Sequence, residues 1–240
     1  MIPRAWRCLF LLFLATPAAV AAQDAPAGWA WTVSPYLLSP HMNGSIGVGT
    51  VDAEVDASPS DIFDNLQFGA MVTVEARSPT WAVAFDGIYM DLGKDAESSE
   101  TGVSLYQAAL ELTAFRRVGP WAEVLAGGRL NLLGAELEGP LGTVAETDES
   151  WLDPFVGVRL SAPFGEGWSA TFRADIGGFG VGSDLAWQVH STVEYRLSPS
   201  LGLTGGYRVL SSDYETGSGA DRFAYDVRTF GPELGVVIHF

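Results

Sequence analysis

A histidine and two carboxylates form the one grouping in this sequence that could do acid–base chemistry. His190 and Glu194 lie four residues apart in an alternating segment, so they share one face of a strand, and Asp175 lies in the segment before it. A histidine beside carboxylates can act as a general base or a metal ligand. Only His41 and His239 accompany it, and no serine stands out as a nucleophile. We therefore expect a hydrogen-bonded structural histidine and assign no catalytic residue.

A glycine-rich string resembles a phosphate-binding loop in composition. DIGGFGVGSD runs from Asp175 to Asp184. Phosphate-binding loops use the amides at the start of a helix, whereas here an alternating, strand-like segment follows. We expect a bent strand end and a loop in which glycine permits positive φ angles and close approach.

Acidic residues gather between the alternating segments. Hard cations such as Ca²⁺ prefer such oxygen ligands, and divalent cations that bridge lipopolysaccharide phosphates would be the partners of these loops. No spacing matches a calcium loop, so we expect solvated acidic loops and assign no metal or cofactor site. The acids are Asp52, Glu54, Asp56, Asp61, Asp64, Asp95, Glu97, Glu100, Glu146, Asp148, Glu149, Asp213, Glu215 and Asp221.

Ten segments with a period of two must position these residues. Most are close to the roughly 9 to 11 residues that a tilted strand needs to cross a membrane. They cover 29–38, 67–77, 81–91, 103–117, 121–132, 151–162, 168–177, 185–197, 201–210 and 232–240. Tight turns at 78–80, 118–120, 163–167 and 198–200 alternate with longer connections at 39–66, 92–102, 133–150, 178–184 and 211–231. Short turns at one end and long loops at the other are typical of bacterial barrels with both termini in the periplasm.

The two faces of these segments differ in charge. One face is uncharged and largely apolar, with side chains such as Phe85, Leu110 and Phe172. An Arg or Lys there would cost about 2 to 4 kcal/mol at the bilayer midplane. The other face carries acids and arginines, which we expect to pair in a confined lumen. The predicted lumen network is Glu75, Asp86, Glu111, Arg129, Asp153, Arg159, Arg173, Asp175, His190, Glu194 and Arg208, with Arg77, Arg117, Glu123, Arg196 and Glu233 on the same face.

Several residues make the strand register less regular. Trp121 and Trp151 fall on the polar phase, so we expect a bulge or a position at the mouth there, and Pro154 gives one reason for a shift. Pro35 and Pro232 also lie in predicted strands, where each removes a ladder hydrogen bond.

The first long connection contains a predicted short helix. In ASPSDIFDNL, Ser58 suits the N-cap, Pro59 the first helical position, and Asp61 the positive end of the helix dipole. Ile62, Phe63 and Leu66 would form its apolar side. One hypothesis is a lid that folds over or into the barrel mouth, and the alternative is an ordered surface turn.

The N-terminus resembles a secretory signal peptide. Arg4 and Arg7 precede an apolar run and a small-residue stretch that ends at Ala22. We expect residues 1–22 to be removed, leaving one domain, 23–240, exported through the general secretory pathway. The only cysteine, Cys8, would leave with the signal, so no disulfide is expected. The formal charge of −16 would become −18, which argues against nucleic acid as a partner.

The C-terminus has the pattern of a closing barrel strand. GPELGVVIHF alternates to the end and stops on Phe240. We expect the barrel-insertion machinery to engage this strand. The segments SPYLLSPHMNGSIGVGTVDAEVDASPSDIFDNLQF, DIGGFGVGSDLAWQ, GYRVLSSDY and GPELGV are similar to a widespread family of uncharacterised outer-membrane β-barrel proteins of Gram-negative bacteria. The resemblance implies fold and location and carries no catalytic residue.

These observations predict an all-β protein, a single antiparallel transmembrane β-barrel of about ten strands in the outer membrane, with eight or twelve as alternatives. Long acidic loops would face outward, and lipid and lipopolysaccharide would surround the barrel. Because open channels appear at about 16 strands, we expect a largely closed lumen with a structural or interaction role and no enzyme activity. The alternatives are a small gated pore, an outer-membrane hydrolase and a soluble periplasmic barrel or sandwich.

Overall fold

The structure is a computed structural model that describes residues 28–94, 102–139 and 142–240. The predicted signal peptide, 1–22, lies outside the described residues, as do the side chains of 94, 102–104, 135–139 and 142–147. The elements are β1 (Ala30–Leu38), β2 (His41–Val48), β3 (Val51–Ala57), α1 (Pro59–Asp64), β4 (Leu66–Arg77), β5 (Trp81–Lys94), β6 (Gly102–Arg117), β7 (Ala122–Gly139), β8 (Gly142–Pro163), β9 (Trp168–Gly178), β10 (Leu185–Ser198), β11 (Leu201–Thr216) and β12 (Phe223–His239).

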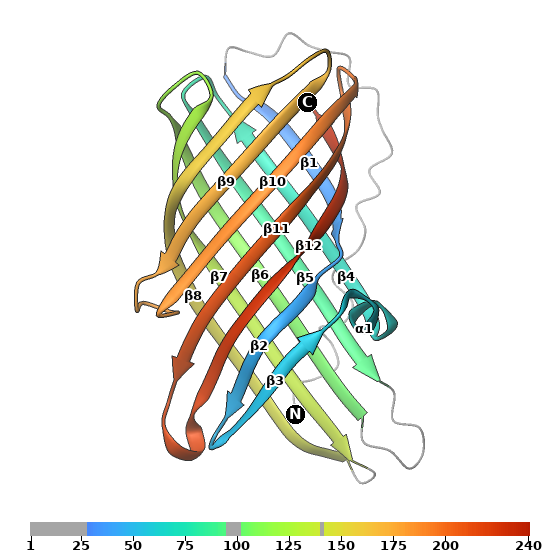
Figure 1. Ribbon diagram of the computed structural model, residues 1–240, viewed down its shortest axis with the longest axis vertical. Helices are drawn as coiled ribbons and strands as arrows, with labels where there is room; N and C mark the ends of the chain where they lie inside the picture. Colours follow the sequence, from blue (N-terminus) through green and yellow to red (C-terminus); the bar gives the residue numbers. More distant parts are fainter. Residues whose placement is uncertain (1–27, 95–101, 140–141) are drawn as a thin grey trace.

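The strands form one antiparallel sheet that closes into a tall barrel (Figure 1). β4 to β11 each pair with the next strand in the chain, and β1 closes the ring because it pairs with β4 on one side and with β12 on the other. Ten strands therefore build the wall, namely β1 and β4 to β12. The prediction of an all-β, ten-stranded antiparallel barrel is confirmed.

Turns separate into two classes at the two ends of the barrel. The connections β4–β5, β6–β7, β8–β9 and β10–β11 are tight and lie at one end, here called the short-turn end (Figure 1). At the opposite, long-loop end, several strands run further than predicted. β7–β8 and β11–β12 continue as paired hairpins through most of the predicted loops 133–150 and 211–231. Those loop predictions are wrong. They assumed that each strand ends where it leaves the membrane, whereas backbone pairing in these hairpins continues beyond the membrane into water.

The predicted loop 39–66 is also largely strand. β12 is longer than β1. Beyond the end of β1, β2 pairs with the remaining part of β12, starting at the pair His41–Phe230. β3 then folds back on β2 as a hairpin. The short helix predicted at Pro59 follows it, and Ser58 caps that helix through a reciprocal capping box with Asp61.

The outer surface of the barrel is apolar. Large hydrophobic side chains that alternate along the strands are exposed there, with Leu203 48%, Phe172 41% and Phe85 40% exposed. Trp31, Trp81 and Trp168 mark the short-turn end of this belt, and Phe68, Tyr106 and Tyr207 mark the other. Within the described ranges, no helix is long and apolar enough to cross a membrane.

Trp121 and Trp151 lie in different environments, one exposed and one buried. Trp121 precedes β7 and is exposed at the short-turn end, which agrees with a position at the mouth. Trp151 lies within β8, pairs in register with Asn131 and is buried inside, stacked on Tyr214 with ring centroids 4.4 Å apart. The bulge expected near Pro154 is absent, because Pro154 pairs in continuous register with Gly128. Trp151 is inward-facing because the interior near it is apolar.

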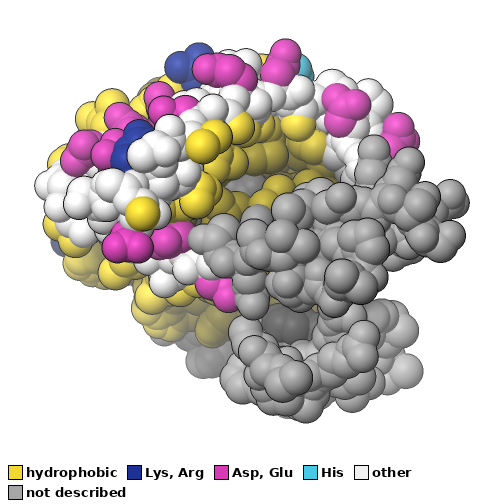
Figure 2. All heavy atoms as spheres, turned by 90° about the horizontal axis from the view of Figure 1, so that it is seen from below, with side chains coloured by type: hydrophobic (Ala, Val, Ile, Leu, Met, Phe, Trp, Pro, Cys, Tyr) yellow, Lys and Arg dark blue, Asp and Glu magenta, His cyan; other side chains and the backbone are white. Residues whose placement is uncertain are grey.

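An apolar cluster fills the interior toward the long-loop end. Its buried members are Tyr36, Leu38, Met42, Ile62, Met71, Ile88, Met90, Leu133, Trp151, Phe223, Tyr225 and Val227, and we call it the inner apolar cluster. Seen from the long-loop end, the barrel is hollowed and hydrophobic side chains line the hollow, while acidic side chains lie on the rim and the outer side (Figure 2). The interior thus changes from apolar to charged along the barrel axis.

Candidate functional site

Two arginines and two glutamates form a ring near the short-turn end of the lumen. Arg77 donates to Glu75 and to Glu123, both at 2.6 Å, and Arg159 donates to the same two carboxylates at 2.5 and 2.7 Å. These residues come from β4, β7 and β8, so the ring spans the lumen. The Arg159 guanidinium also lies over the Phe115 ring, 3.5 Å from its centroid, where the aromatic face takes the place of water.

A second ring of the same composition lies deeper. Arg129 contacts Glu111 at 2.9 Å and Asp175 at 3.1 Å, and Arg173 contacts the same two carboxylates at 2.5 and 2.9 Å. All four side chains are nearly fully buried. Each arginine is thus matched by two acids and each acid by two arginines, which is the arrangement that makes charges tolerable away from water.

A third group lies beside these rings. Arg208 contacts Asp86 at 2.9 Å and Glu233 at 3.4 Å, and His190 Nε2 lies 2.6 Å from Glu233 Oε1. The Tyr36 hydroxyl donates to Asp86 at 2.7 Å. Tyr36 also belongs to the inner apolar cluster, so this group joins the charged and the apolar parts of the interior.

Asp153 is the exception among the lumen carboxylates, because it is fully buried and, among the described side chains, contacts no arginine. It accepts hydrogen bonds from Asn131, from the Trp151 ring N–H, and from both the backbone N–H and the hydroxyl of Ser183. Ser183 belongs to the connection between β9 and β10. Asp153 therefore fastens this connection to the lumen with neutral donors alone.

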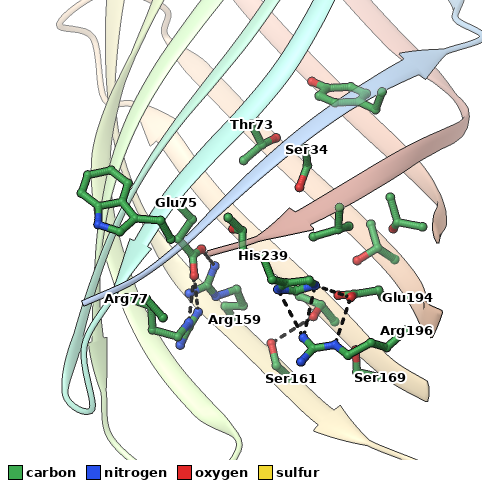
Figure 3. Close-up of a pocket in the computed structure, with 18 of the residues that line it drawn as sticks. Ser34, Thr73, Glu75, Arg77, Arg159, Ser161, Ser169, Glu194, Arg196 and His239 are labelled. Atoms are coloured by element: carbon green, nitrogen blue, oxygen red, sulfur yellow. Dashed lines mark hydrogen bonds and ion pairs between the residues drawn. The ribbon is translucent and has the colours of Figure 1, made fainter. Parts of the chain in front are cut away.

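A cavity of about 640 Å³ occupies the lumen at the short-turn end. Figure 3 shows it between two charged groups: Glu75, Arg77 and Arg159 on one side and Glu194, Arg196 and His239 on the other. Hydroxyl groups complete the wall, among them Ser34, Thr73, Ser161 and Ser169. Its inner part reaches Tyr36, His190, Thr204, Arg208 and Glu233. The lining of hydroxyls and paired charges suits water or a small polar solute.

The residues of the predicted lumen network lie inside the barrel, whereas Arg117 on the same face is exposed at the short-turn end, and the network residues do not all meet in the predicted way. Asp175 and Glu194 are not partners of His190: Asp175 binds Arg129 and Arg173, and Glu194 lies 2.8 Å from His239. The expected grouping of His190 with these two carboxylates is therefore wrong. The register places Arg173 and Arg208 beside His190 on its two neighbouring strands, and Glu233 is its carboxylate partner.

The glycine-rich string ends a strand and turns into the next one. β9 ends at Gly178, whose φ is +85°, and β10 begins at Leu185 with no helix between them. At Gly182 a Cβ would lie 2.5 Å from the carbonyl oxygen of Leu152, so only glycine fits this close approach. The glycines of this string let the β9–β10 turn come close to β8, where Asp153 binds Ser183.

Acidic side chains outside the barrel bind arginine in one place. Arg222 lies beyond the apolar belt and contacts Asp52 at 2.8 Å and Glu215 at 3.1 Å, which ties the β2–β3 hairpin to β11. Hydrogen bonds that Arg222 donates to Asp52 and then to Glu215 raise the pKa of Arg222. Among the described side chains, no group of three or more His, Cys, Asp or Glu could hold a metal ion. The predicted loop acids Asp95, Glu97, Glu100 and Glu146 lie outside the described side chains.

The helix α1 lies at the side of the barrel, next to the ends of β3 and β4, rather than across an open end (Figure 1). Ile62 is buried in the inner apolar cluster and Leu66 packs partly against that cluster, whereas Phe63 is 46% exposed. The helix therefore does not lie across the open mouth, and it places Ile62 in the interior. α1 occupies the side wall because the β2–β3 hairpin, not the helix, continues the chain to the long-loop end.

Sequence reasoning missed most of the uncharged interior. Met71 and Ile88 point inward on the same phase as the charged residues, but only the charged residues of that phase were predicted to lie in the lumen. Tyr36 and Asn131 are also lumen residues that bind predicted carboxylates. Their phase along the strand, shared with charged neighbours, is the signal that could have found them.

Comparison with known proteins finds neither a matching family model nor a matching curated protein. Solved structures that match are bacterial outer-membrane proteins. Ail, the attachment invasion locus protein of Yersinia pestis, in complex with a heparin analogue, has a TM-score of 0.43 at 9% identity, over 90% of this chain and 100% of that chain. The outer-membrane protease OmpT from Escherichia coli has a TM-score of 0.43 at 12% identity, over 90% and 98%. Neisserial surface protein A has a TM-score of 0.34 at 15% identity, over 89% and 99%. With its apolar outer belt, its aromatic borders and its charged lumen, this chain has the architecture of an integral outer-membrane β-barrel.

Proposed function

We propose that this protein is a sealed outer-membrane barrel with a structural or interaction role and without enzyme activity. In this proposal the short turns face the periplasm, and the β2–β3, β7–β8 and β11–β12 hairpins stand outside the cell within reach of lipopolysaccharide and divalent cations. Export through the general secretory pathway and insertion through the strand that ends at Phe240 belong to the same proposal.

The observation that carries the proposal is the pair of arginine–carboxylate rings inside the lumen, one joining β4, β7 and β8 and the other joining β6, β7 and β9. An ion that passed would have to separate Arg129 and Arg173 from Glu111 and Asp175, all four of which are buried. Separation would leave unpaired charges away from water, and breaking a buried pair costs about 3 to 5 kcal/mol. The inner apolar cluster adds a second barrier, because an apolar lining does not hydrate an ion.

Conductance in planar lipid bilayers tests this proposal. We expect the purified protein to give no stable openings. The double variant Arg129→Ala, Arg173→Ala removes both cations of the deeper ring and should give measurable leak currents, whereas Arg116→Ala, an exposed arginine outside the lumen, should behave like the wild type. Large, stable openings of the wild type would disprove the sealed lumen.

The cavity at the short-turn end favours a second candidate, a gated pore for a small polar solute. Its volume of about 640 Å³ would hold such a solute, and hydroxyls and paired charges line it. Deleting residues 44–64 distinguishes the two candidates. A pore gated by this segment would conduct more after the deletion, whereas a barrel sealed by the charged rings would stay silent. A heat-dependent shift in gel mobility would show that the deleted protein still folds.

A further inference from the structure

The barrel wall is interrupted at one place toward the long-loop end. β4 pairs with β1 only from Arg77 to Val72, so among the described residues its part 66–71 has no strand partner on that side. The outer edge of β3 likewise has no strand partner in the described part of the chain. We call the interval between β3 and residues 66–71 the side notch; Figure 1 shows α1 beside it.

Two prolines explain why the ladder ends there. Pro35 is the last β1 residue paired with β4, and it has no N–H to donate. Pro40 follows the end of β1 and separates it from β2. The buried Leu38 amide, which would have continued the ladder, donates instead to the Met71 sulfur at 3.2 Å. A thioether is a weak acceptor, so little holds β1 and β4 together at this point.

Inside the notch the lining is apolar and rich in methionine. Met42, Met71 and Met90 are all of the methionines after Met1, and all three belong to the inner apolar cluster. Methionine side chains are unbranched and flexible, and they repack around guests of irregular shape. The cluster contains no charged member. A guest that enters here would therefore be uncharged and apolar.

Outside the notch the surface is also apolar. Leu37 is 68% exposed and Phe68 is 51% exposed, and both lie on the strands that border the interruption. Phe68 packs near Tyr89 at the long-loop border of the lipid belt, with ring centroids 6.0 Å apart. Phe63 of α1 is exposed as well. The interruption thus adjoins the bilayer, and apolar side chains line both of its sides.

Ile62 is the residue that now fills the inner end of the notch. It is 2% exposed, and it lies on a single short helix that begins with the Ser58 capping box. A side chain on so small an element can move aside at low cost, because the strands on either side need not part.

We propose that the side notch admits one hydrocarbon chain of a lipid from the outer leaflet into the methionine-lined interior. The chain takes the space of Ile62, Met42 and Met71 repack around it, and the headgroup stays outside beside α1. This site depends on the membrane placement of the barrel and is independent of whether the lumen conducts ions.

Photocrosslinking tests the proposal on the full folded chain in phospholipid vesicles. A phosphatidylcholine with a diazirine in its acyl chain serves as the probe, and mass spectrometry maps the adducts. We expect adducts on Met42 and Met71 in addition to residues of the outer belt such as Leu203. Ile62→Ala, which enlarges the inner end of the notch, should at least double the yield at the two methionines, while Leu203→Ala, at the short-turn end of β11, should leave that yield unchanged.

Three outcomes would overturn the proposal. Adducts confined to the outer belt would show that lipid chains stay outside. An Ile62→Ala variant that keeps its heat-dependent gel mobility but gains no interior adducts would show that the notch is not the entrance. Labelling of Met42 and Met71 by a photoactivatable alkane added in water, without labelling by the phospholipid, would assign the site to a water-borne apolar solute.

Discussion

Each arginine of the deeper ring holds two buried acids at once, so a single substitution should act on three charges. Arg129→Ala leaves Glu111 and Asp175 to share Arg173. We expect a loss of about 3 to 5 kcal/mol in the free energy of unfolding, the cost of breaking a buried pair by removing one partner. Urea unfolding of the protein inserted in lipid vesicles measures this loss.

The matched control for that substitution is Arg116→Ala. Arg116 is exposed, and its guanidinium lies over the Trp81 ring, 4.9 Å from the centroid. It should lose no more than about 1 kcal/mol, as is usual for exposed cation–π contacts. Equal losses in the two variants would mean that the ring contributes no more than an ordinary surface contact.

Asp153 offers a second residue-scale prediction because its partners are neutral donors. Asp153→Ala would leave Asn131, Trp151 and Ser183 with unsatisfied donors in a dry interior. We expect a loss of about 1 to 3 kcal/mol for each donor that finds no other acceptor. Asp153→Asn keeps one acceptor oxygen and should lose less. Urea unfolding of both variants decides the order, and equal losses would contradict it.

Charge made the site residues predictable, and its absence hid the others. Glu111 and Arg173 had to lie inside, because a charge on the lipid face is costly. No comparable penalty fixes Met71 or Ile88, and only their phase, shared with Glu75 and Asp86, places them inside. His190 could be placed on the inner face, but its partner Glu233 lies 43 residues away on β12, with β11 between the two strands. Such contacts depend on the stagger of three strands, which alternation alone does not specify.

At the scale of elements, α1 depends on its cap more than on its length. The helix covers only Pro59–Asp64, and Ser58 and Asp61 satisfy each other's backbone N–H groups. Ser58→Ala should destabilise the helix by about 0.5 to 2 kcal/mol. We expect faster hydrogen exchange in 59–65 without change in β9 or β10. Unchanged exchange in α1 would show that Ile62, through its burial, holds the helix without the cap.

The β11–β12 hairpin should respond to pH. Burial, then Asp226, Asp184 and Glu215, raise the pKa of Asp213, which lies beyond the apolar belt and directly opposite Asp226. A raised pKa means that the folded hairpin favours the protonated form, so this stability is present at acid pH and is lost as pH rises through the shifted value. The sign follows from burial of the Asp213 carboxyl and from its repulsion by the ionised neighbours.

Hydrogen exchange of wild type against Asp213→Asn, measured at each pH, tests this sign. The variant should protect the hairpin better than wild type at neutral pH, and the difference should vanish as Asp213 becomes protonated. Glu54→Gln, an exposed acid on β3, serves as the control and should show no such trend. A wild-type hairpin that is more protected at neutral pH than the variant would contradict the expected direction.

Strand positions were predictable because membrane-crossing segments must alternate, and the prediction of ten strands is confirmed. Strand ends at the long-loop end were not. The extension of β11 to Thr216 pairs residues such as Asp213 and Asp226 that face water on one side, so no apolar stripe marks it. β2 and β3 were not predicted for the same reason, since no apolar stripe marks this hairpin and exposed acids such as Asp52 and Glu54 lie on β3.

For the whole molecule, the uneven ends of the barrel should give it one orientation in the cell. The long-loop end carries the acidic rim seen in Figure 2, and the short-turn end carries tight turns such as 163–167. Large polar hairpins must cross the membrane during insertion, and short turns are the parts that remain on the side from which the barrel enters. A tag that a protease can cut should therefore be cleaved on intact cells when it is placed between β2 and β3, at 49–50. The same tag within 163–167 should be cleaved only after the outer membrane is opened. Cleavage at 163–167 on intact cells would mean that the barrel has the opposite orientation. The side notch would then adjoin the inner leaflet, so this measurement also bears on where a lipid chain could enter.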